Sequence, residues 1–357
     1  MMKDIPVDKL QQILNDFVDS GKECGLQLSI YQGGQLAADL CAGFTDSSRT
    51  QKVTKDSLFP IFSSGKAVMT TAFLMLWEEY GFSFQDKVSE YWHEFVGSGK
   101  ENTEIHHVLS HRTGLHMLPG VTATSDQLAD WDFMCAKLCA ATPKWTPGTT
   151  CGYQGMTFAW LLGELAYRIS GIPFKKYIED KILIPLGIEN DFFFGTTDEA
   201  EKRVVDIDDT AFNGAISFTP LFHRNPVLRK AFIPSANGIA SAGAAAKIFN
   251  ALYHSNNGNP LLKKETIELA TRLNRHPNDP IPPREWAKFG LGYALPLWEK
   301  QQGDIFGHGG ACGAEFLYCK SKDLALCFVK NRALPEHPDH TIRDHISAAL
   351  DLPTRFW

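Results

Sequence analysis

The first segments of the chain carry two different hydrophobic patterns. Val7–Ser20 has apolar residues at helical spacing on one face, and a glycine follows it. This pattern predicts an amphipathic helix. The next two runs, Leu26–Tyr31 and Gln35–Gly43, have strand length and are joined by two consecutive glycines. Such a pair is typical of a β-hairpin.

The middle of the chain is mostly helical in pattern. Phe59–Gly81 is apolar almost all round beyond its first residues, which predicts a buried helix rather than an amphipathic one. A second apolar helix is expected over Met156–Ser170, after a loop rich in proline, glycine and threonine. Two short strands are expected at Phe192-Phe193-Phe194 and Ala215–Phe218, and Ser235–Gly243 has the small residues of a turn.

The last part of the chain returns to runs of strand length. Four strands are expected there, separated by turns that contain glycine or aspartate, and Ile342–Leu350 predicts a closing helix. The four strands are Phe289–Trp298, Gly303–Gly310, Ala314–Cys319 and Leu324–Lys330.

This order of elements predicts an α/β (α+β) fold. An antiparallel sheet flanked by helices would be built from both chain ends, with a mostly helical lobe inserted between them. The expected domains are residues 1–70 plus 215–357 for the sheet and 71–214 for the helices. A site is expected in the cleft between them, with walls from Met117–Trp131 and Asp191–Phe232.

Composition narrows the class of protein. Of the 357 residues, 44% are hydrophobic and 21% are charged, which is ordinary for a globular protein. The net charge of −6 gives no reason to expect nucleic acid or an anionic membrane surface as a partner. No uncharged apolar run reaches the roughly 18 residues that cross a bilayer.

Location is inferred from the N-terminus and the cysteines. The first residues include acids and no apolar core of a signal peptide. Eight scattered cysteines contain no C-x-x-C pair, which favours free thiols in a reducing compartment over a disulfide framework. A cytoplasmic protein is expected. His106, His107 and His111 are close in sequence, but no further ligands follow at metal spacing, so neither a metal nor a cofactor is expected.

Ser63 and Lys66 are the first candidates for chemistry. They are three residues apart at the start of the apolar helix, so their side chains would meet on one face. A serine nucleophile needs a neighbouring base and a site for an oxyanion, and a helix N-terminus favours negative charge. An alternative is that Ser63 caps the helix and Lys66 is solvated. Residues elsewhere in the chain that could complete a catalytic site distinguish these two interpretations.

Two further motifs follow the serine-lysine pair in order. They are Gly152-Tyr153-Gln154-Gly155 and Gly307-His308-Gly309-Gly310-Ala311. With them, the chain resembles the serine β-lactamase and penicillin-binding superfamily, whose members carry S-x-x-K, Y-x-N and K-T-G or H-x-G in this order. The nearest resemblance is to class C β-lactamases, D-Ala-D-Ala peptidases and family VIII carboxylesterases. LSHRTGL at 109–115 and SANGIASAGAAAKIFNAL at 235–252 also resemble family segments.

The resemblance implies a β-lactamase/transpeptidase-like fold and a role for each matching residue. Ser63 would be the acyl-accepting nucleophile and Lys66 would help to remove its proton. Tyr153 would bridge the nucleophile and the leaving group. The backbone N–H groups of Ser63 and Ala311 would form the oxyanion hole. His308 stands at the lysine position of K-T-G.

Two departures from the family pattern indicate the substrate. Gly155 replaces the asparagine of Y-x-N, whose amide helps to hold the acylamino group of lactams. His308 replaces a fixed cation, and histidine is only partly charged near neutral pH. Gly309 and Gly310 would let substrate approach the strand backbone closely. Both departures favour a neutral, small-molecule ester.

Three hypotheses result. The first is a serine hydrolase of carboxylic esters that works through an acyl-enzyme on Ser63, like the family VIII esterases. The second is a β-lactamase or D-Ala-D-Ala peptidase-like hydrolase with weak β-lactam activity. The third, from another class, is a non-catalytic binding or assembly protein on the same fold.

Overall fold

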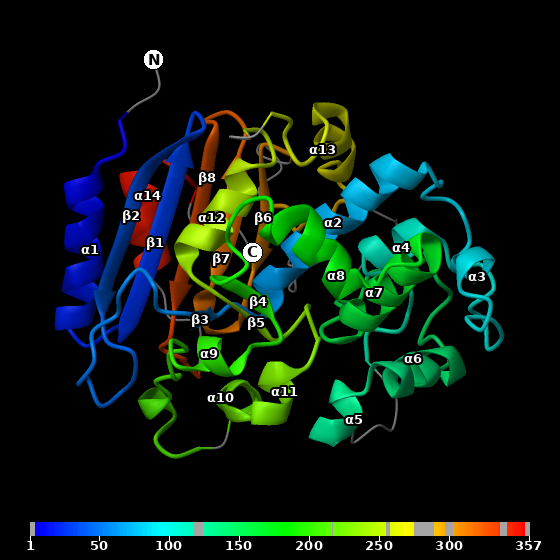
Figure 1. Ribbon diagram of the computed structural model, residues 1–357, viewed down its shortest axis with the longest axis horizontal. Coiled ribbons are helices and arrows are strands. Elements are labelled where there is room, and N and C mark those ends of the chain that lie inside the picture. The colour runs from blue at the N-terminus through cyan, green and yellow to red at the C-terminus, as the bar shows by residue number, and fades with distance from the viewer. Residues whose placement is uncertain are drawn as a thin grey trace.

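The two ends of the chain meet in one antiparallel sheet. The computed structural model describes residues 4–117, 124–215, 217–254, 258–274, 289–296, 303–335 and 341–353. A five-stranded sheet within them has the order β2-β1-β8-β7-β6 (Figure 1). Because β1 pairs antiparallel with β8, the N-terminal hairpin and the C-terminal strands form a single layer. The strands are β1 Gly25–Gln32, β2 Gln35–Gly43, β6 Ile305–Gly309, β7 Glu315–Cys319 and β8 Leu324–Lys330.

Side-chain alternation along β1 decides which helices cover each face of the sheet. On one face, α1 (Val7–Asp19) and α14 (Ile342–Ala349) pack against alternate apolar residues of β1. These residues are Leu26, Leu28 and Ile30. On the other face, Gln27 accepts a hydrogen bond from the Ala242 N–H at 2.9 Å, at the start of α12 (Ala242–Asn250). The sheet is therefore covered on both faces.

A second, three-stranded sheet has the order β3-β5-β4. Its strands are β3 (Phe59–Pro60), β5 (Gly238–Ala240) and β4 (Phe192–Phe194). The strand at 192–194 agrees with the sequence prediction. That strand was indicated by its run of three aromatic residues rather than by a period, whereas β3 and β5 are equally short and have no such run.

The helix α2 (Gly65–Tyr80) is buried along most of its length, as its apolar sequence predicts. It runs from the sheet into a group of helices on the far side of the molecule (Figure 1). These helices are α3 Val88–Tyr91, α4 Ile105–Leu109, α5 Ser125–Ala129, α6 Trp131–Ala140, α7 Thr157–Ser170 and α8 Phe174–Ile178. The loop before α7 that the sequence predicts is present. α2 is thus the element that connects the sheet to the helical part.

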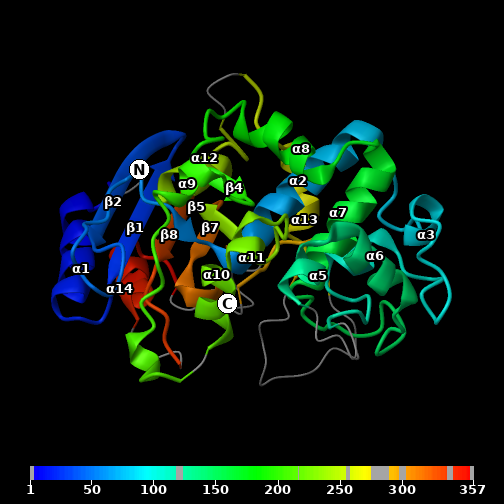
Figure 2. The same cartoon turned by 60° about the horizontal axis from the view of Figure 1, so that its bottom comes forward.

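The remaining helices are short, and α9, α10 and α11 lie on segments with weak sequence periodicity. Asn225 Nδ2 donates to Ser125 Oγ at 2.7 Å, which holds α11 beside α5 (Figure 2). These helices are α9 Asp198–Glu201, α10 Phe218–Arg224, α11 Pro226–Lys230 and α13 Lys264–Ala270. The division into two domains with the boundaries given above stays a prediction.

Three local predictions are wrong. Phe218 begins α10, so the strand expected at Ala215–Phe218 does not form; residue 216 lies outside the described residues. Ser235–Gly243 is not turn throughout, since it contains β5. In Phe289–Trp298, only isolated bridges occur, from Ala294 to Phe289 and to Gly307, and residues 297–298 lie outside the described part.

Two further observations concern membrane-spanning helices and the state of the cysteines. Among the described helices, none has the length and hydropathy needed to span a bilayer. All eight cysteines are free thiols, and five of them are buried.

Candidate active site

Ser63 lies in a short 3-10 turn, Phe62–Ser64, that leads directly into α2. The α-helix begins at Gly65, two residues later than the sequence analysis assumed. Phe62 has a φ of 43°, a left-handed conformation that costs a non-glycine residue about 1–3 kcal/mol and is common at functional sites. This turn presents the Ser63 side chain, which is half-buried, toward Lys66. Lys66 Nζ lies 3.1 Å from Ser63 Oγ.

Lys66 is completely buried, with 0% of its surface exposed. Its Nζ also donates to the Ser235 carbonyl at 2.8 Å. Within the described part of the chain, no carboxylate forms an ion pair with it, and burial lowers the pKa of Lys66 well below its ordinary value of 10.5. The alternative in which Lys66 is solvated in the first turn is therefore wrong. An uncharged amine in this place can accept a proton from the serine hydroxyl.

Tyr153 reaches the same serine from the loop before α7. Its side chain forms a hydrogen bond with Ser63, and burial raises the pKa of its hydroxyl above 10. Lys66 Nζ lies 4.9 Å from the centroid of the Tyr153 ring. The structure therefore brings together the three residues that the sequence motifs selected: Ser63, Lys66 and Tyr153.

The turn after β6 lies against the turn that carries Ser63. A Cβ added at Gly310 would lie only 2.2 Å from the Ile61 carbonyl oxygen, so no larger residue fits there. Ser64 Oγ donates to the Ala314 carbonyl at 3.2 Å and ties the two turns together. Ala311, in the 3-10 turn Ala311–Gly313, is exposed. The turn after β6 is thus packed against the turn that carries Ser63, and the oxyanion role of the Ala311 N–H stays a prediction.

His308 lies on β6, the last strand in the order of the five-stranded sheet, and is buried. Its Nδ1 lies 2.6 Å from the Gly309 carbonyl. Because a carbonyl oxygen only accepts, Nδ1 carries the proton and Nε2 the lone pair. Burial, followed by the nearby Lys66, lowers the pKa of His308 to about 3. His308 is thus neutral at pH 7, rather than partly charged as its sequence position alone suggests.

Gly155 faces open space. A Cβ added there would have no neighbour within 4 Å, and its N–H donates to the Tyr153 carbonyl at 3.1 Å. The position that carries an asparagine in the family motif is therefore unfilled here.

Two contributors to this site have no chemical signal of their own in the sequence. Ser235 contributes its backbone carbonyl to Lys66, and a backbone group leaves no trace in residue type. His111 appears in the sequence only as one of several neighbouring histidines, yet it packs on the Tyr153 ring. Both belong to segments that resembled family motifs, and that resemblance was the only signal that could have found them.

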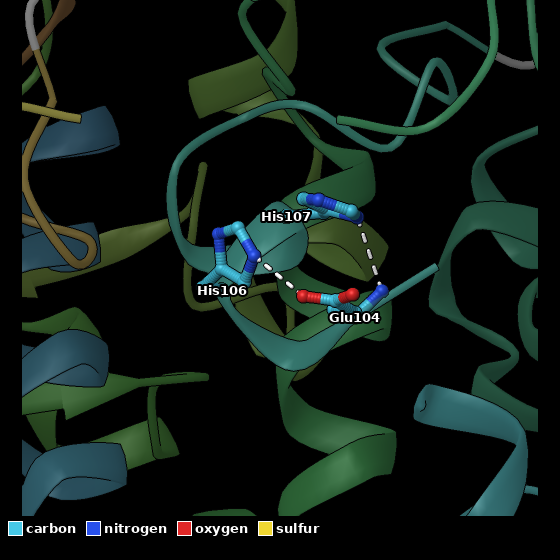
Figure 3. Close-up of side chains that lie close together, drawn as sticks. All are labelled: Glu104, His106 and His107. Carbon is cyan, nitrogen blue, oxygen red and sulfur yellow. Dashed lines mark hydrogen bonds and ion pairs between the residues drawn. The ribbon is translucent and has the colours of Figure 1, made fainter. Parts of the chain in front are cut away.

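Glu104, His106 and His107 form the group of side chains that comes closest to a metal site in the described residues (Figure 3). Their contacts are those of a helix N-terminus: the Glu104 N–H donates to His107 Nδ1 at 3.0 Å, and Glu104 Oε2 lies 2.7 Å from His106 Nε2. A metal at His107 Nδ1 would have to displace a backbone hydrogen bond. The geometry is that of a capping box on α4.

The chain is similar to known proteins over most of its length. The model of the family described as Beta-lactamase matches residues 10–351. The chain is similar to the esterase/beta-lactamase LipL of Mycobacterium tuberculosis, with 28% identity over 87% of this chain and 77% of the relative. Among solved structures, a family VIII carboxylesterase has a TM-score of 0.86 at 24% identity, with 96% of each chain covered. A penicillin-binding protein homologue from Caulobacter crescentus has a TM-score of 0.82 at 26% identity and covers 96% of this chain and 95% of its own. These similarities confirm the predicted fold class.

Proposed function

The chain belongs to the beta-lactamase family, and from this premise we propose that it is a serine hydrolase that cleaves carboxylic esters through an acyl-enzyme on Ser63. One observation carries the proposal. A completely buried lysine, whose pKa is lowered by that burial, lies 3.1 Å from a half-buried serine hydroxyl. Lysine is a poor base at its ordinary pKa, so this burial is what makes it fit for the reaction.

The reaction begins at the pair Ser63 and Lys66. Neutral Lys66 takes the hydroxyl proton as Ser63 Oγ attacks the ester carbonyl carbon. The carbonyl oxygen becomes an oxyanion, which the backbone N–H groups of Ser63 and Ala311 stabilise. Tyr153, hydrogen-bonded to Ser63 and protonated, donates its hydroxyl proton to the departing alkoxide as the carbon–oxygen bond breaks, and takes the Ser63 proton from Lys66 in its place. An alcohol leaves and the acyl group stays on Ser63.

Water then completes the cycle. Lys66, again neutral, accepts a proton from water as the water oxygen attacks the acyl carbon. The tetrahedral intermediate collapses, the bond to Ser63 Oγ breaks, and the serine regains its proton. A carboxylic acid is released. The proton that Ser63 lost to the alcohol is replaced by one from water, so the enzyme returns to its starting protonation state.

The surroundings of the serine favour an ester over a lactam or a peptide. His308 is neutral at pH 7 because its pKa is about 3, so it offers no cation to the carboxylate of a β-lactam or a peptide. Gly155 offers no side-chain amide to an acylamino group. A neutral ester requires neither contact. The small-molecule substrate is therefore expected to be uncharged near the reacting carbonyl.

A direct comparison of substrates tests this function. The wild-type protein is expected to hydrolyse p-nitrophenyl acetate and butyrate with a kcat/KM at least about a hundredfold above that for a chromogenic cephalosporin, since each missing contact is worth a factor of about 10. Both reactions are followed by absorbance under the same conditions. Cephalosporin turnover equal to that of the better ester would reverse the ranking of the two substrate classes.

Hydrolysis of β-lactams remains a second candidate because the relative LipL carries both activities in its name. A non-catalytic protein on the same fold is the candidate from another class. A fluorophosphonate separates it from both hydrolases, because the reagent forms a covalent bond only with an activated serine. Failure to label the protein would favour the non-catalytic alternative.

Gly155→Asn is expected to shift the preference toward lactams. The position is open, since no atom lies within 4 Å of an added Cβ, and an asparagine there adds an amide beside Tyr153. We expect kcat/KM for the cephalosporin to rise about tenfold, the value of one hydrogen bond to substrate, while ester turnover changes less. Gly155→Ala is the matched control, since it adds the same Cβ without the amide. Equal cephalosporin rates in both variants would contradict this expectation.

A further inference from the structure

The loop that carries Tyr153 is bound on both sides by a single residue, His111. The Gln154 N–H donates to His111 Nδ1 at 3.1 Å. The Gly152 N–H donates to the His111 carbonyl at 2.9 Å. The backbone groups immediately before and after Tyr153 are therefore fixed by one side chain and one carbonyl of the same residue.

The ring of His111 also packs directly on the tyrosine. The two ring centroids are 5.1 Å apart. On its other sides the imidazole contacts Phe158 at 4.9 Å and Phe289 at 4.2 Å between centroids. With 0% of its surface exposed, His111 cannot rotate without displacing these rings. It thus forms a rigid support beneath Tyr153.

The conformation of His111 is unusual for its residue type. Its φ is 59°, in the left-handed region that non-glycine residues rarely adopt. This backbone turn directs both the carbonyl and the side chain of one residue toward the 152–154 loop. Strain of this kind persists where the surrounding structure holds it and is frequent at functional sites.

The hydrogen bond from Gln154 defines the protonation state that the contact needs. Since Nδ1 accepts, the neutral ring carries its proton on Nε2. A second proton would occupy Nδ1 and break the contact. The charged or titratable groups that face the ring are Lys66 on α2, His308 on β6 and Tyr153 itself. Burial, followed by Lys66 and His308, lowers the pKa of His111 well below 6.5, so the accepting form persists at neutral pH.

We propose that His111 is the positioning residue for Tyr153, acting through its Nδ1 lone pair on the Gln154 N–H rather than by contact with substrate. The inference rests on the proposed ester hydrolysis, in which Tyr153 moves a proton to the leaving group. Proton transfer requires donor and acceptor within hydrogen-bond reach, and a displacement of about 1 Å costs about a hundredfold in rate.

The test compares His111→Asn with His111→Gly. Both residues suit a positive φ, but only asparagine keeps an acceptor near the place of Nδ1. On p-nitrophenyl butyrate, H111N is expected to keep kcat within about threefold of wild type, whereas H111G loses about a hundredfold in kcat with little change in KM. H111Q, which matches the Nε2 position instead, is expected to behave like H111G and replaces it if H111G does not fold.

Each kcat is expressed per active site, counted by fluorophosphonate titration. A role in folding alone would reduce the number of active sites and leave kcat per site unchanged, which would overturn the proposal. Equal kcat values for H111N and H111G, or an active H111Q beside an inactive H111N, would overturn it too. A wild-type protein without ester turnover would instead refute the proposed function, so the two failures are distinguishable.

Discussion

Ser63→Ala is expected to lower kcat/KM for p-nitrophenyl butyrate by about four orders of magnitude or more, because no acyl-enzyme can form without the hydroxyl. The loss should appear in kcat, since Ser63 supplies the bond that forms and not the binding of the apolar ester. Initial rates and mass spectrometry of the protein after reaction with a fluorophosphonate measure turnover and acylation separately. The variant should show neither.

Ser64→Ala is the matched control, one residue away on the same turn. Its hydroxyl is buried and donates to the Ala314 carbonyl at 3.2 Å, so it faces the neighbouring turn rather than Lys66. The variant should lose about 1 kcal/mol of stability from that bond and keep kcat within a few-fold. Equal turnover by wild type and Ser63→Ala would refute Ser63 as the nucleophile. An inactive Ser64→Ala would instead indicate that Ser64 is the nucleophile.

The fold could be predicted where the hydrophobic pattern was long enough to define a period. The hairpin of β1 and β2 and the strands β6, β7 and β8 each extend over five residues or more, so their patterns were visible. By contrast, β3 and β5 have two and three residues. Their pairing depends on α2 and the large sheet bringing distant segments together, which no local pattern records.

The candidate site could be predicted as a set of residues but not as an electrostatic environment. The spacing of Ser63 and Lys66 implied contact between their side chains, and the structure shows that contact. The state of Lys66 depends on complete burial and on the Ser235 carbonyl, which only tertiary packing determines. For the same reason, the sequence suggested a partly charged His308, whereas burial makes it neutral.

Burial affects three basic side chains of the site in the same way. Lys66, His111 and His308 all have lowered pKa values, and burial is the largest contribution to each. Their mutual proximity reinforces the effect, since Lys66 lowers the pKa of both histidines. A protonated site would therefore carry a cation without a counter-charge among the described residues. The site is built to hold proton acceptors in their neutral form, which suits the activation of a serine and the binding of an uncharged substrate.

Two replacements of Lys66 are expected to show whether this side chain acts as a proton acceptor or as a positive charge. Lys66→Arg keeps a positive charge at all working pH values but cannot take a proton, and it should lose about a thousandfold in kcat. Lys66→Met has a similar shape without an amine and should lose as much. In the wild type, kcat/KM should fall as pH falls through the pKa of Lys66, because protonation removes the base, and the lowered pKa places this limb well below pH 10.5. Rates measured across pH for the three proteins provide the test. An active Lys66→Arg would show that Lys66 does not act as the base.

The same lysine should reduce the stability of the fold, and this gives an independent measurement. Its pKa is lowered in the folded state and about 10.4 in the unfolded chain. Between these values the unfolded state binds more protons, so the free energy of unfolding rises with pH across that window. Lys66→Met removes this term. It should therefore have a higher Tm than wild type at neutral pH, with the difference shrinking as pH approaches about 10.4. A lower Tm for Lys66→Met at neutral pH would mean that the amine is charged and stabilised by a partner. That result would contradict the proposal that Lys66 is a neutral base.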